Sequence, residues 1–348
     1  MKDNQLQETR WRQYAAAFIA ESKHRGYSQA EIDLCLQYAK PLMLSGFPVI
    51  YDVVHFCGLV GYDPAYVIGA TRSTEYYYRY YEISKKSGGF RAIAEPLPSL
   101  KEIQRWILEN ILDNVKINAA AKAFRKNVFI NDNARFHRGQ EYVLTVDVKD
   151  FFPSISPKRI FKVFERIGYS KNVCSILTDL CCLKGGLPQG APTSPSLSNS
   201  VCRYIDAQLL AFAKKNGLRY TRYADDITVS GDKVGADTIF YLYRILKKHG
   251  FTPNEAKTRL QRKHQRQQVT GIIVNEKMQA PRELRREIRQ HAFFVKKYGF
   301  DDHAAWLEID KAHYKEHLLG KAGFVISVNK NDRDALNLLK AFRENSAD

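Results

Sequence analysis

The sequence predicts an α+β fold, and two observations carry that prediction. Segments with helical periodicity occupy both ends of the chain, and short apolar runs bounded by turn residues lie between them. Two of those runs, at 219–223 and 227–230, predict an antiparallel hairpin with two acids at its tip. The 348 residues exceed one average domain, so two or three subdomains are expected.

Residues 1–45 are expected to form two helices. Trp11, Tyr14 and Phe18 give the first helix an apolar stripe. Ser28 stands at the start of the second helix and is its expected N-cap.

A β-hairpin is expected next. Aromatic enrichment at 76–81 favours a strand, and 90–94 resumes it after the glycine-containing turn at 85–89. Because Lys85 and Lys86 lie in that turn, the tip of the hairpin is expected to be positive.

The remaining elements follow from the same patterns. Strands are expected at 142–147, 258–262 and 269–274, and a loop rich in Gly, Pro and Ser at 184–196. Helices are expected at 100–112, 157–167, 170–183, 196 to about 215, 236–249, and from Pro281 onward with that proline at the first helical position.

The chain is strongly basic. Its net charge of +17 and pI near 9.5 favour a polyanionic partner, either nucleic acid or an anionic membrane surface. No apolar run approaches the ~20 residues of a membrane span, and the polar segment 1–12 is unlike a signal peptide. For these reasons we expect no membrane partner. The six cysteines form no CxxC pair, so we expect reduced thiols in a cytoplasmic protein.

Three aspartates stand where carboxylates are costly. Asp147 ends the apolar run VLTVD, and Asp225 and Asp226 lie in RYADDITVS, at the expected hairpin tip. Adjacent carboxylates repel each other unless a cation neutralises them, and hard oxygen ligands suit Mg²⁺. Two such ions would support nucleotidyl transfer. The alternative is that Asp225 and Asp226 form a solvated turn and Asp147 caps a strand.

Four segments, in order, resemble the reverse transcriptases. They are VDVKDFFPSI at 146–155, LPQGAPTSPSLSN at 187–199, YADD at 223–226 and GFTPNEAKT at 250–258. This resemblance implies a right-hand polymerase fold with fingers, palm and helical thumb, and an RNA-directed DNA polymerase activity. We expect an N-terminal helical segment at 1–45, fingers and palm at 46–265, and an RNA-binding thumb at 266–348.

The resemblance also implies roles for particular residues. Two Mg²⁺ ions would be bound by Asp147, Asp225, Asp226 and the backbone of Val148. Contacts to the incoming dNTP would come from Arg91, Asp150, Phe151, Phe152, Gln189 and Lys257. Phe152 occupies the family's steric-gate position, where a bulky ring excludes a ribose 2′-hydroxyl; core packing is the alternative role for this ring.

Two further segments resemble signatures of the bacterial retron reverse transcriptases. They are NARFH at 133–137, which fits NAxxH, and VTG at 269–271; AFRKN at 123–127 is similar to a third. The implied RNA contacts are Arg125, Lys126, Asn133, His137, Val269, Thr270 and Gly271. The alternatives are a packing role for His137, a cap at Asn133, and an ordinary strand and turn at VTG.

The retron resemblance implies a specific set of partners. The enzyme would bind its own structured non-coding RNA, the msr-msd transcript, and would use dNTPs. It would prime from the 2′-hydroxyl of an internal guanosine and produce branched single-stranded DNA, the msDNA. Such units serve antiphage defence with an effector, here expected to be a separate protein.

An arginine stripe is expected to hold RNA in the thumb. Arg282, Arg285, Arg286 and Arg289 recur at helical spacing and could neutralise phosphates along a duplex. A solvated helix face paired with Glu283 and Glu287 is the alternative.

Three other functions compete with this interpretation. An RNA-dependent RNA polymerase shares the palm chemistry, but Phe152 argues against it. Another reverse transcriptase class, such as the group II intron type, usually carries additional regions. A scaffold that binds RNA or msDNA and restrains an effector without doing chemistry would not need all three aspartates.

Overall fold

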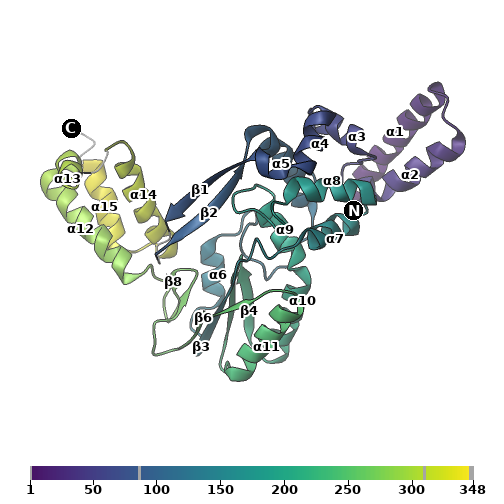
Figure 1. The fold of residues 1–348 in the computed structure, drawn as a ribbon. Coiled ribbons are helices and arrows are strands. Elements are labelled where there is room, and N and C mark those ends of the chain that lie inside the picture. The colour runs from purple at the N-terminus through teal and green to yellow at the C-terminus, as the bar shows by residue number, and fades with distance from the viewer. Residues whose placement is uncertain (1, 85–87, 309–310, 345–348) are drawn as a thin grey trace. The chain divides into compact units, whose positions relative to one another are not determined.

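The computed structural model describes residues 2–84, 88–308 and 311–344 (Figure 1). They fold as two compact units. Unit 1 comprises Met1–Asn118 and Asp150–Tyr204, and unit 2 comprises Ala119–Lys149 and Ile205–Asp348. This division separates parts of the expected fingers and palm segment, 46–265, and it does not test the functional boundaries, which stay predictions.

Unit 1 begins with the two expected helices. Helices α1 (Lys2–His24) and α2 (Gln29–Leu44) lie side by side. Ser28 is confirmed as the N-cap of α2: its hydroxyl accepts from the Glu31 N–H at 3.4 Å, and the Glu31 carboxylate accepts from the Ser28 N–H at 2.9 Å. This reciprocal pair satisfies two backbone donors that a helix start otherwise leaves open.

The expected hairpin is confirmed in unit 1, with a later start. Strands β1 (Tyr78–Ser84) and β2 (Phe90–Pro96) pair antiparallel, from Tyr78 opposite Pro96 to Ser84 opposite Phe90. Tyr76 and Tyr77 belong instead to a 3₁₀ turn, η1 (Thr74–Tyr77). The expected positive tip, with Lys85 and Lys86, lies outside the described residues.

Helices make up the rest of unit 1. They are α3 (Val53–Val60), α4 (Pro64–Arg72), α5 (Pro98–Asn110), η2 (Leu112–Asn114), α7 (Pro157–Ile167), α8 (Lys171–Cys181) and α9 (Ser194–Val201). A buried amide joins three elements at their core: Gln104 on α5 donates to the Tyr78 hydroxyl at 2.8 Å and to the Leu180 carbonyl at 2.7 Å. Residues 100–112, 157–167 and 170–183 are therefore helical close to the expected bounds.

Unit 2 contains a four-stranded antiparallel sheet with the order β4-β5-β3-β6. The strands are β3 (Tyr142–Val148), β4 (Arg219–Tyr223), β5 (Asp226–Gly231) and β6 (Pro253–Arg262), and the helices are α6 (Ile130–Phe136), α10 (Arg203–Lys215) and α11 (Ala236–Lys248). Val143 and Val146 on β3 and Val229 on β5 are buried, as expected for central strands covered by packed elements.

The prediction of a single strand at 269–274 is wrong. The chain forms two very short antiparallel strands there, β7 (Gln268–Val269) and β8 (Ile272–Ile273). Thr270 and Gly271 between them have φ of 47° and 84°, in the left-handed region that reverses the chain and cannot continue a strand.

The end of unit 2 is helical, as expected. Helices α12 (Arg282–Tyr298), α13 (Phe300–Trp306), α14 (Lys311–Val328) and α15 (Arg333–Glu344) enclose a core that includes Ile288, Val295, Leu318, Val325 and Leu338. Pro281 is the N-cap residue of α12, one position before the helix, and not its first residue as expected.

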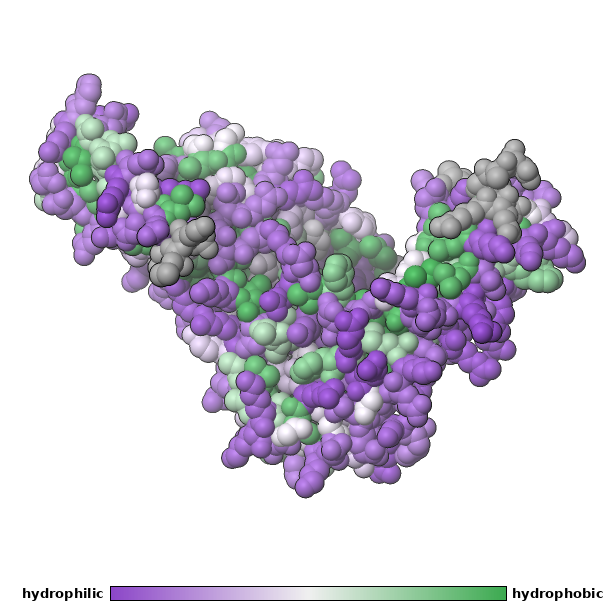
Figure 2. Space-filling view, turned by 180° about the vertical axis from the view of Figure 1, so that it is seen from behind, coloured by the Kyte–Doolittle hydropathy of each residue, from purple (hydrophilic) through white to green (hydrophobic). Residues whose placement is uncertain are grey.

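Most of the molecular face drawn in Figure 2 is hydrophilic, with separate hydrophobic areas. Within the described residues no single helix is long and apolar enough to cross a membrane, although the bent pair α3 and α4, at 110°, passes that test of length and composition jointly.

Candidate active site

The structure brings the three aspartates together at one end of the unit 2 sheet. Asp147 on β3 is the cross-strand partner of Asp226, the first residue of β5. Asp225 lies in the turn before β5, and its carbonyl accepts from the Val148 N–H at 3.1 Å. Asp147 and Asp226, nearly eighty positions apart in sequence, are therefore neighbours held by strand pairing, and the backbone of Val148 bonds to the adjoining turn.

The turn that carries Asp225 is tight and strained. Tyr223 pairs with Asp226, so only Ala224 and Asp225 connect β4 to β5. Ala224 has φ of 57°, a conformation that L-residues seldom adopt, and the Arg222 guanidinium donates to its carbonyl at 3.0 Å. The protein thus holds a sharp reversal in the residue next to the paired acids.

A β-bulge lies beside the third acid. The register between β3 and β6 shifts between Thr145 and Asp147, and bulges commonly redirect a side chain near functional sites. Beyond the shift, Asn254 of β6 faces Asp147 and donates its amide N–H to the carboxylate at 2.9 Å. The carboxylate orientation of Asp147 is therefore set from β6.

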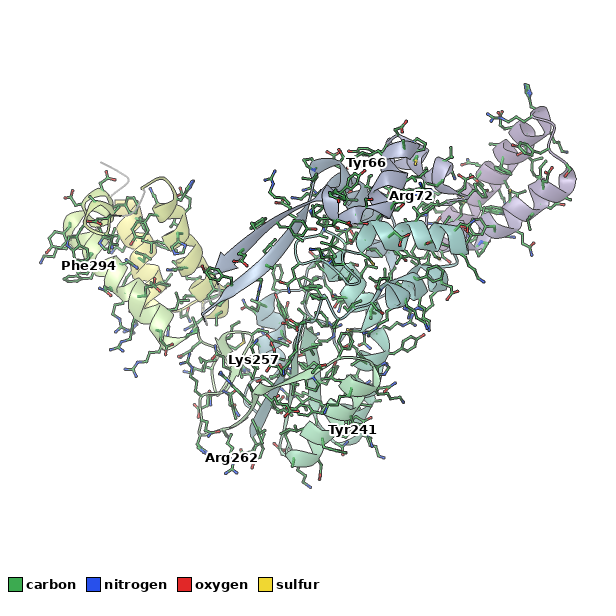
Figure 3. The ribbon with its side chains drawn as sticks, viewed as in Figure 1. Tyr66, Arg72, Tyr241, Lys257, Arg262 and Phe294 are labelled. Atoms are coloured by element: carbon green, nitrogen blue, oxygen red, sulfur yellow. The ribbon has the colours of Figure 1, made fainter. Side chains whose placement is uncertain are left out.

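Burial and repulsion between the acids both disfavour the charged form of Asp226. Burial, and then the neighbouring Asp225 and Asp147 carboxylates, raise the pKa of Asp226 to about 7. Lys257, on β6, opposes this rise, because its ammonium lies 3.2 Å from both carboxylate oxygens of Asp147 (Figure 3). One lysine does not neutralise three acids, and the site retains a demand for positive charge.

The donor set fits a hard divalent cation. Among the described residues no group of three or more His, Cys, Asp or Glu side chains is placed so that it could hold a metal ion by itself. Mg²⁺ does not need one, since it is usually bound by one or two carboxylates with substrate phosphates and water completing its shell. Asp147, Asp225 and Asp226 supply such carboxylates. The Lys257 ammonium, which contacts Asp147, would keep that contact or give it up when a metal cation binds.

Unit 1 gathers most of the residues predicted to contact a dNTP. The Gln189 carbonyl accepts from the Ala94 N–H of β2 at 2.8 Å, and the Phe152 carbonyl accepts from the Leu187 N–H at 3.1 Å. The loop that follows α8 is thereby tied on one side to the Phe152 turn and on the other to the strand of Arg91.

Glycine is required where this loop meets β2. A Cβ on Gly190 would lie 2.6 Å from the Ala94 carbonyl oxygen, and its φ of 132° is one that L-residues rarely adopt. Arg91 is exposed on β2, and Phe152 is partly buried, with its ring 5.4 Å from that of Phe151.

Two residues that precede Phe152 differ in their exposure to solvent. Phe151 is buried, whereas Asp150 is exposed with φ of 44°. The Phe151 ring is therefore not available at the surface. Because these residues belong to unit 1 and the aspartates to unit 2, their joint role at one dNTP stays a prediction.

The NAxxH residues form a buried hydrogen-bonded network in unit 2. His137 contacts the Ser230 hydroxyl through Nδ1 and the Thr221 hydroxyl through Nε2, both at 2.7 Å. The Thr221 hydroxyl donates to the Asn133 side-chain oxygen at 2.6 Å, and the Asn133 amide reaches the Thr270 hydroxyl at 3.5 Å. Burial lowers the pKa of His137 to about 3, so its imidazole is neutral.

This burial does not support direct RNA contact by three of the predicted residues. The side chains of Asn133, His137 and Val269 have no exposed surface. They join α6 to β4 and β5 and support the turn at Thr270 and Gly271. Within the two motifs, Arg135, Phe136 and that turn reach the surface. The packing alternative agrees with the burial of His137, whereas Asn133 lies inside α6 and bonds to side chains, so it does not cap the helix.

The basic residues around residue 125 are partly committed to the protein. Arg125 is half-buried and donates to the Ala121 carbonyl at 3.1 Å, whereas Lys126 is exposed. Exposed rings at Phe124 and Phe129 flank them, which the sequence reasoning did not select.

The arginine stripe on α12 is split in two. Arg289 makes a bidentate ion pair with Asp334 of α15, with both nitrogen–oxygen distances 2.8 Å, and Arg285 lies 3.9 Å from Asp332. These two hold α12 against the last helix. Arg282 and Arg286 are exposed, and the described part of the chain shows no ion pair for either. Of the four arginines, Arg282 and Arg286 are therefore the ones for which RNA contact stays a prediction.

The sequence reasoning missed a buried ion pair behind the aspartates. Arg222 donates to both carboxylate oxygens of Asp206, at 2.8 and 2.7 Å, and the Tyr220 hydroxyl donates to the same carboxylate at 2.7 Å. The side chains of Arg222 and Asp206 are 1% and 0% exposed. The sequence did contain one indication of this pair, the arginine within the strand RYTRY. A guanidinium that is buried in a strand needs an acidic partner.

Comparison with known proteins gives consistent matches. A family profile described as reverse transcriptase (RNA-dependent DNA polymerase) matches residues 83–274. The retron Ec86 reverse transcriptase of Escherichia coli is 36% identical over 271 residues, covering 76% of this chain and 80% of that protein. The retron Mx162 reverse transcriptase of Myxococcus xanthus is 34% identical and covers 62% of this chain and 52% of that protein.

Solved structures of low sequence identity also match. A telomerase from Candida albicans in complex with a telomeric RNA fragment aligns with a TM-score of 0.44 and 13% identity, covering 76% of this chain and 61% of that one. A foamy viral protease–reverse transcriptase in complex with double-stranded DNA aligns with a TM-score of 0.41 and 17% identity, covering 71% and 35%.

Proposed function

This chain belongs to the bacterial retron reverse transcriptases and is an RNA-directed DNA polymerase, and we propose that it makes branched msDNA from its own non-coding RNA. The observation that carries the catalytic part is the cross-strand pairing of Asp147 with Asp226, with Asp225 in the adjoining turn. Strand pairing holds these acids in place before any substrate arrives.

The metal requirement follows from this cluster. Reverse transcriptases use divalent metal, and we propose two Mg²⁺ ions held by Asp147, Asp225 and Asp226 with the backbone at Val148. When bound, such a pair supplies activation of the attacking hydroxyl and stabilisation of the triphosphate leaving group. Asn254 donates a hydrogen bond to the Asp147 carboxylate and would orient it. Lys257 contacts the same carboxylate and would contact a phosphate or donate a proton once Asp147 binds metal.

Selection of the nucleotide is assigned to unit 1. Phe152 would exclude a ribose 2′-hydroxyl, and Gln189 would contact the incoming nucleotide or its template base. Arg91 would bind the triphosphate through its planar guanidinium. The backbone bonds that tie the Leu187–Gly190 loop to the Phe152 turn and to β2 support a common function for these residues.

Recognition of the cognate msr-msd RNA is assigned to exposed groups of unit 2. These are Arg282 and Arg286 on α12, the turn at Thr270 and Gly271, and Lys126. Asn133 and His137 act indirectly by supporting that turn. Basic groups of this kind give salt-dependent binding to phosphates, while specific readout needs unpaired bases.

The proposed biological setting is the cytoplasm, in antiphage defence. Synthesis would start from the 2′-hydroxyl of a guanosine within the RNA and leave a 2′–5′ linked RNA–DNA molecule. A separate effector protein would complete the system. The support for this setting is the match to retron reverse transcriptases over most of the chain.

The experiment that tests msDNA synthesis expresses the chain together with its flanking non-coding DNA. Short DNA is examined on a denaturing gel before and after debranching and RNase treatment. Asp225→Asn should abolish the band, whereas Asp232→Asn, an exposed acid just after β5, should retain it. Unbranched DNA that depends on Asp225 would reject the retron assignment, and RNA binding without DNA would favour the scaffold alternative.

A further inference from the structure

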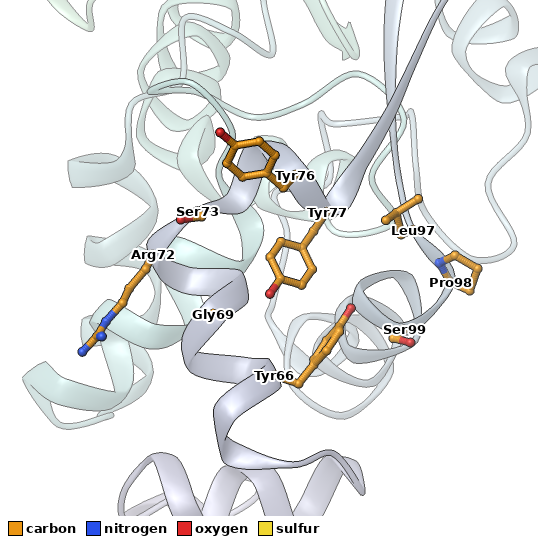
Figure 4. Close-up of a pocket in the computed structure, with 9 residues that line it drawn as sticks. All are labelled: Tyr66, Gly69, Arg72, Ser73, Tyr76, Tyr77, Leu97, Pro98 and Ser99. Carbon is orange, nitrogen blue, oxygen red and sulfur yellow. The ribbon is translucent and has the colours of Figure 1, made fainter.

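Unit 1 has a cavity lined by tyrosines, and its described lining includes none of the residues assigned to the dNTP. Its volume is about 630 Å³, and it lies between the end of α4, the η1 turn and the start of α5 (Figure 4). The lining includes Tyr66, Gly69, Arg72, Tyr76 and Tyr77. This volume is in the range that holds one ligand of nucleotide size.

The walls of the cavity are preformed by packing. The Tyr77 ring stands edge-on to that of Tyr66, with centroids 5.3 Å apart and an interplanar angle of 86°. The Tyr77 carbonyl accepts from the Leu97 N–H at 2.8 Å. The Tyr77 hydroxyl lies directly over Gly69, where an added Cβ would be only 2.6 Å away. A glycine at 69 is therefore what allows this position of the Tyr77 ring.

The accessible groups at the cavity are one aromatic face and one cation. Tyr76 is 77% exposed, although a large aromatic side chain ordinarily gains by burial. Arg72 is exposed, and in the described part of the chain it has no ion pair. No Asp or Glu lines the cavity among the described residues. In Figure 4 the Arg72 side chain points away from the Tyr66 and Tyr77 rings, so its guanidinium lies beside the cavity and not inside it. Exposed rings, a cation at the edge and no lining acid together suit a planar ligand that carries a phosphate outside the cavity.

We propose that this tyrosine cavity binds an unstacked base of single-stranded RNA, with Arg72 contacting an adjoining phosphate. Single-stranded nucleic acid is bound in this manner, by bases stacked on aromatic rings and phosphates paired with basic groups. The net charge of +17 favours nucleic acid over a peptide partner as the occupant. The inference rests on the proposed function only in supplying RNA as the natural ligand.

Crosslinking tests the site directly. The full chain is irradiated with a 12-nucleotide single-stranded RNA containing 5-iodouridine, and adducts are mapped by mass spectrometry. We expect adducts on Tyr66, Tyr76 or Tyr77. Affinity for the same RNA is measured by fluorescence anisotropy, and Tyr76→Ala should weaken it by roughly tenfold, the scale of one lost stacking interaction.

Three further variants separate binding from structure. Tyr76→Phe should restore affinity because it keeps the ring, and Arg72→Gln should weaken binding and reduce its salt dependence. Gly69→Ala should weaken binding by displacing Tyr77, with melting temperature measured alongside. Tyr27→Ala is the matched control, an exposed tyrosine of unit 1 outside the cavity, and should bind as the wild type does.

Two results would overturn the inference. They are adducts confined to other residues, and equal affinities for the Tyr76→Ala and Tyr27→Ala variants. Primer extension by the wild-type protein on an RNA template is measured in the same preparation. Extension without cavity adducts would refute the cavity alone. Cavity adducts without extension would refute the proposed function and leave the cavity standing, because binding does not require chemistry.

Discussion

Replacing Asp206 by asparagine should leave the buried Arg222 guanidinium without its carboxylate counter-ion inside unit 2. The two guanidinium–carboxylate bonds, of 2.8 and 2.7 Å, are lost or weakened, and neither side chain can reach water. Charge-assisted hydrogen bonds contribute about 1.5–3 kcal/mol each. Removing one partner of a buried ion pair costs about 3–5 kcal/mol, and the two figures agree.

That loss is large against total stability. A folded domain is stable by only about 5–15 kcal/mol, so a loss of about 3–5 kcal/mol in Asp206→Asn should remove roughly a fifth or more of the free energy of unfolding. Urea unfolding measures it. Arg222→Met should be similarly harmful, because the Asp206 carboxylate is then buried without its cation.

The double variant Asp206→Leu, Arg222→Met should recover much of the stability. Replacing both charges with apolar groups of similar size is often near neutral. We expect a coupling of at least ~3 kcal/mol between the two sites. Additive losses, or single losses below about 1 kcal/mol, would refute the reasoning.

Activity separates stability from positioning. The double variant lacks the Arg222 bond to the carbonyl of Ala224, the strained residue before Asp225. DNA synthesis should therefore stay low, with a higher Mg²⁺ requirement, although the fold is restored. Recovery of wild-type activity in the stable double variant would show that Arg222 does not position this turn.

Three other predictions follow from single residues. Burial lowers the pKa of His137 from 6.5 to about 3. As the pH falls below 6.5, only the unfolded chain takes up this proton. The free energy of unfolding therefore decreases between pH 6.5 and pH 3. Urea unfolding between pH 6.5 and 4.5 should show a weaker pH dependence in His137→Gln than in wild type, and equal slopes would contradict this assignment. The pKa of Asp226 is raised from 3.8 to about 7, so metal-free stability should fall as pH rises through that interval. In EDTA at pH 8, Asp226→Asn should melt at a higher temperature than wild type, and Mg²⁺ should narrow that gap; a lower melting temperature in EDTA would count against repulsion at the site. Phe152→Ala should raise incorporation of NTPs relative to dNTPs by tenfold or more, measured by competitive primer extension, and an unchanged ratio would assign Phe152 to core packing.

Local patterns in the sequence predicted most elements and the grouping of Asp147, Asp225 and Asp226. The helix at 157–167 and the hairpin that presents Asp225 were predictable because periodicity and turn chemistry act over a few residues. The tyrosine run at 76–81 was not resolved by composition: Tyr78 is buried in the core, and Tyr76 is exposed in a turn. Aromatic enrichment suits both environments.

Long-range partners account for what the sequence could not predict. Arg289 resembled an RNA contact because Asp334, its partner, stands 45 positions away on another helix. His137 was not recognised as a buried residue because its hydrogen-bond partners, Ser230 and Thr221, lie more than 80 positions later in the sequence. Its burial lowers the pKa and keeps the imidazole neutral. The positive φ of Thr270 likewise has no signature in residue type, so a turn was taken for part of a strand.

The most direct test of the central claim is RNA-templated DNA synthesis by the purified chain. A DNA primer annealed to an RNA template is extended with labelled dNTPs and Mg²⁺, by the wild type and by the Asp225→Asn and Asp232→Asn variants. The account predicts extension by the wild type and by Asp232→Asn, with loss of at least a hundredfold in Asp225→Asn. Extension that survives in Asp225→Asn, or a wild-type protein that binds the duplex and adds no nucleotide, would contradict it.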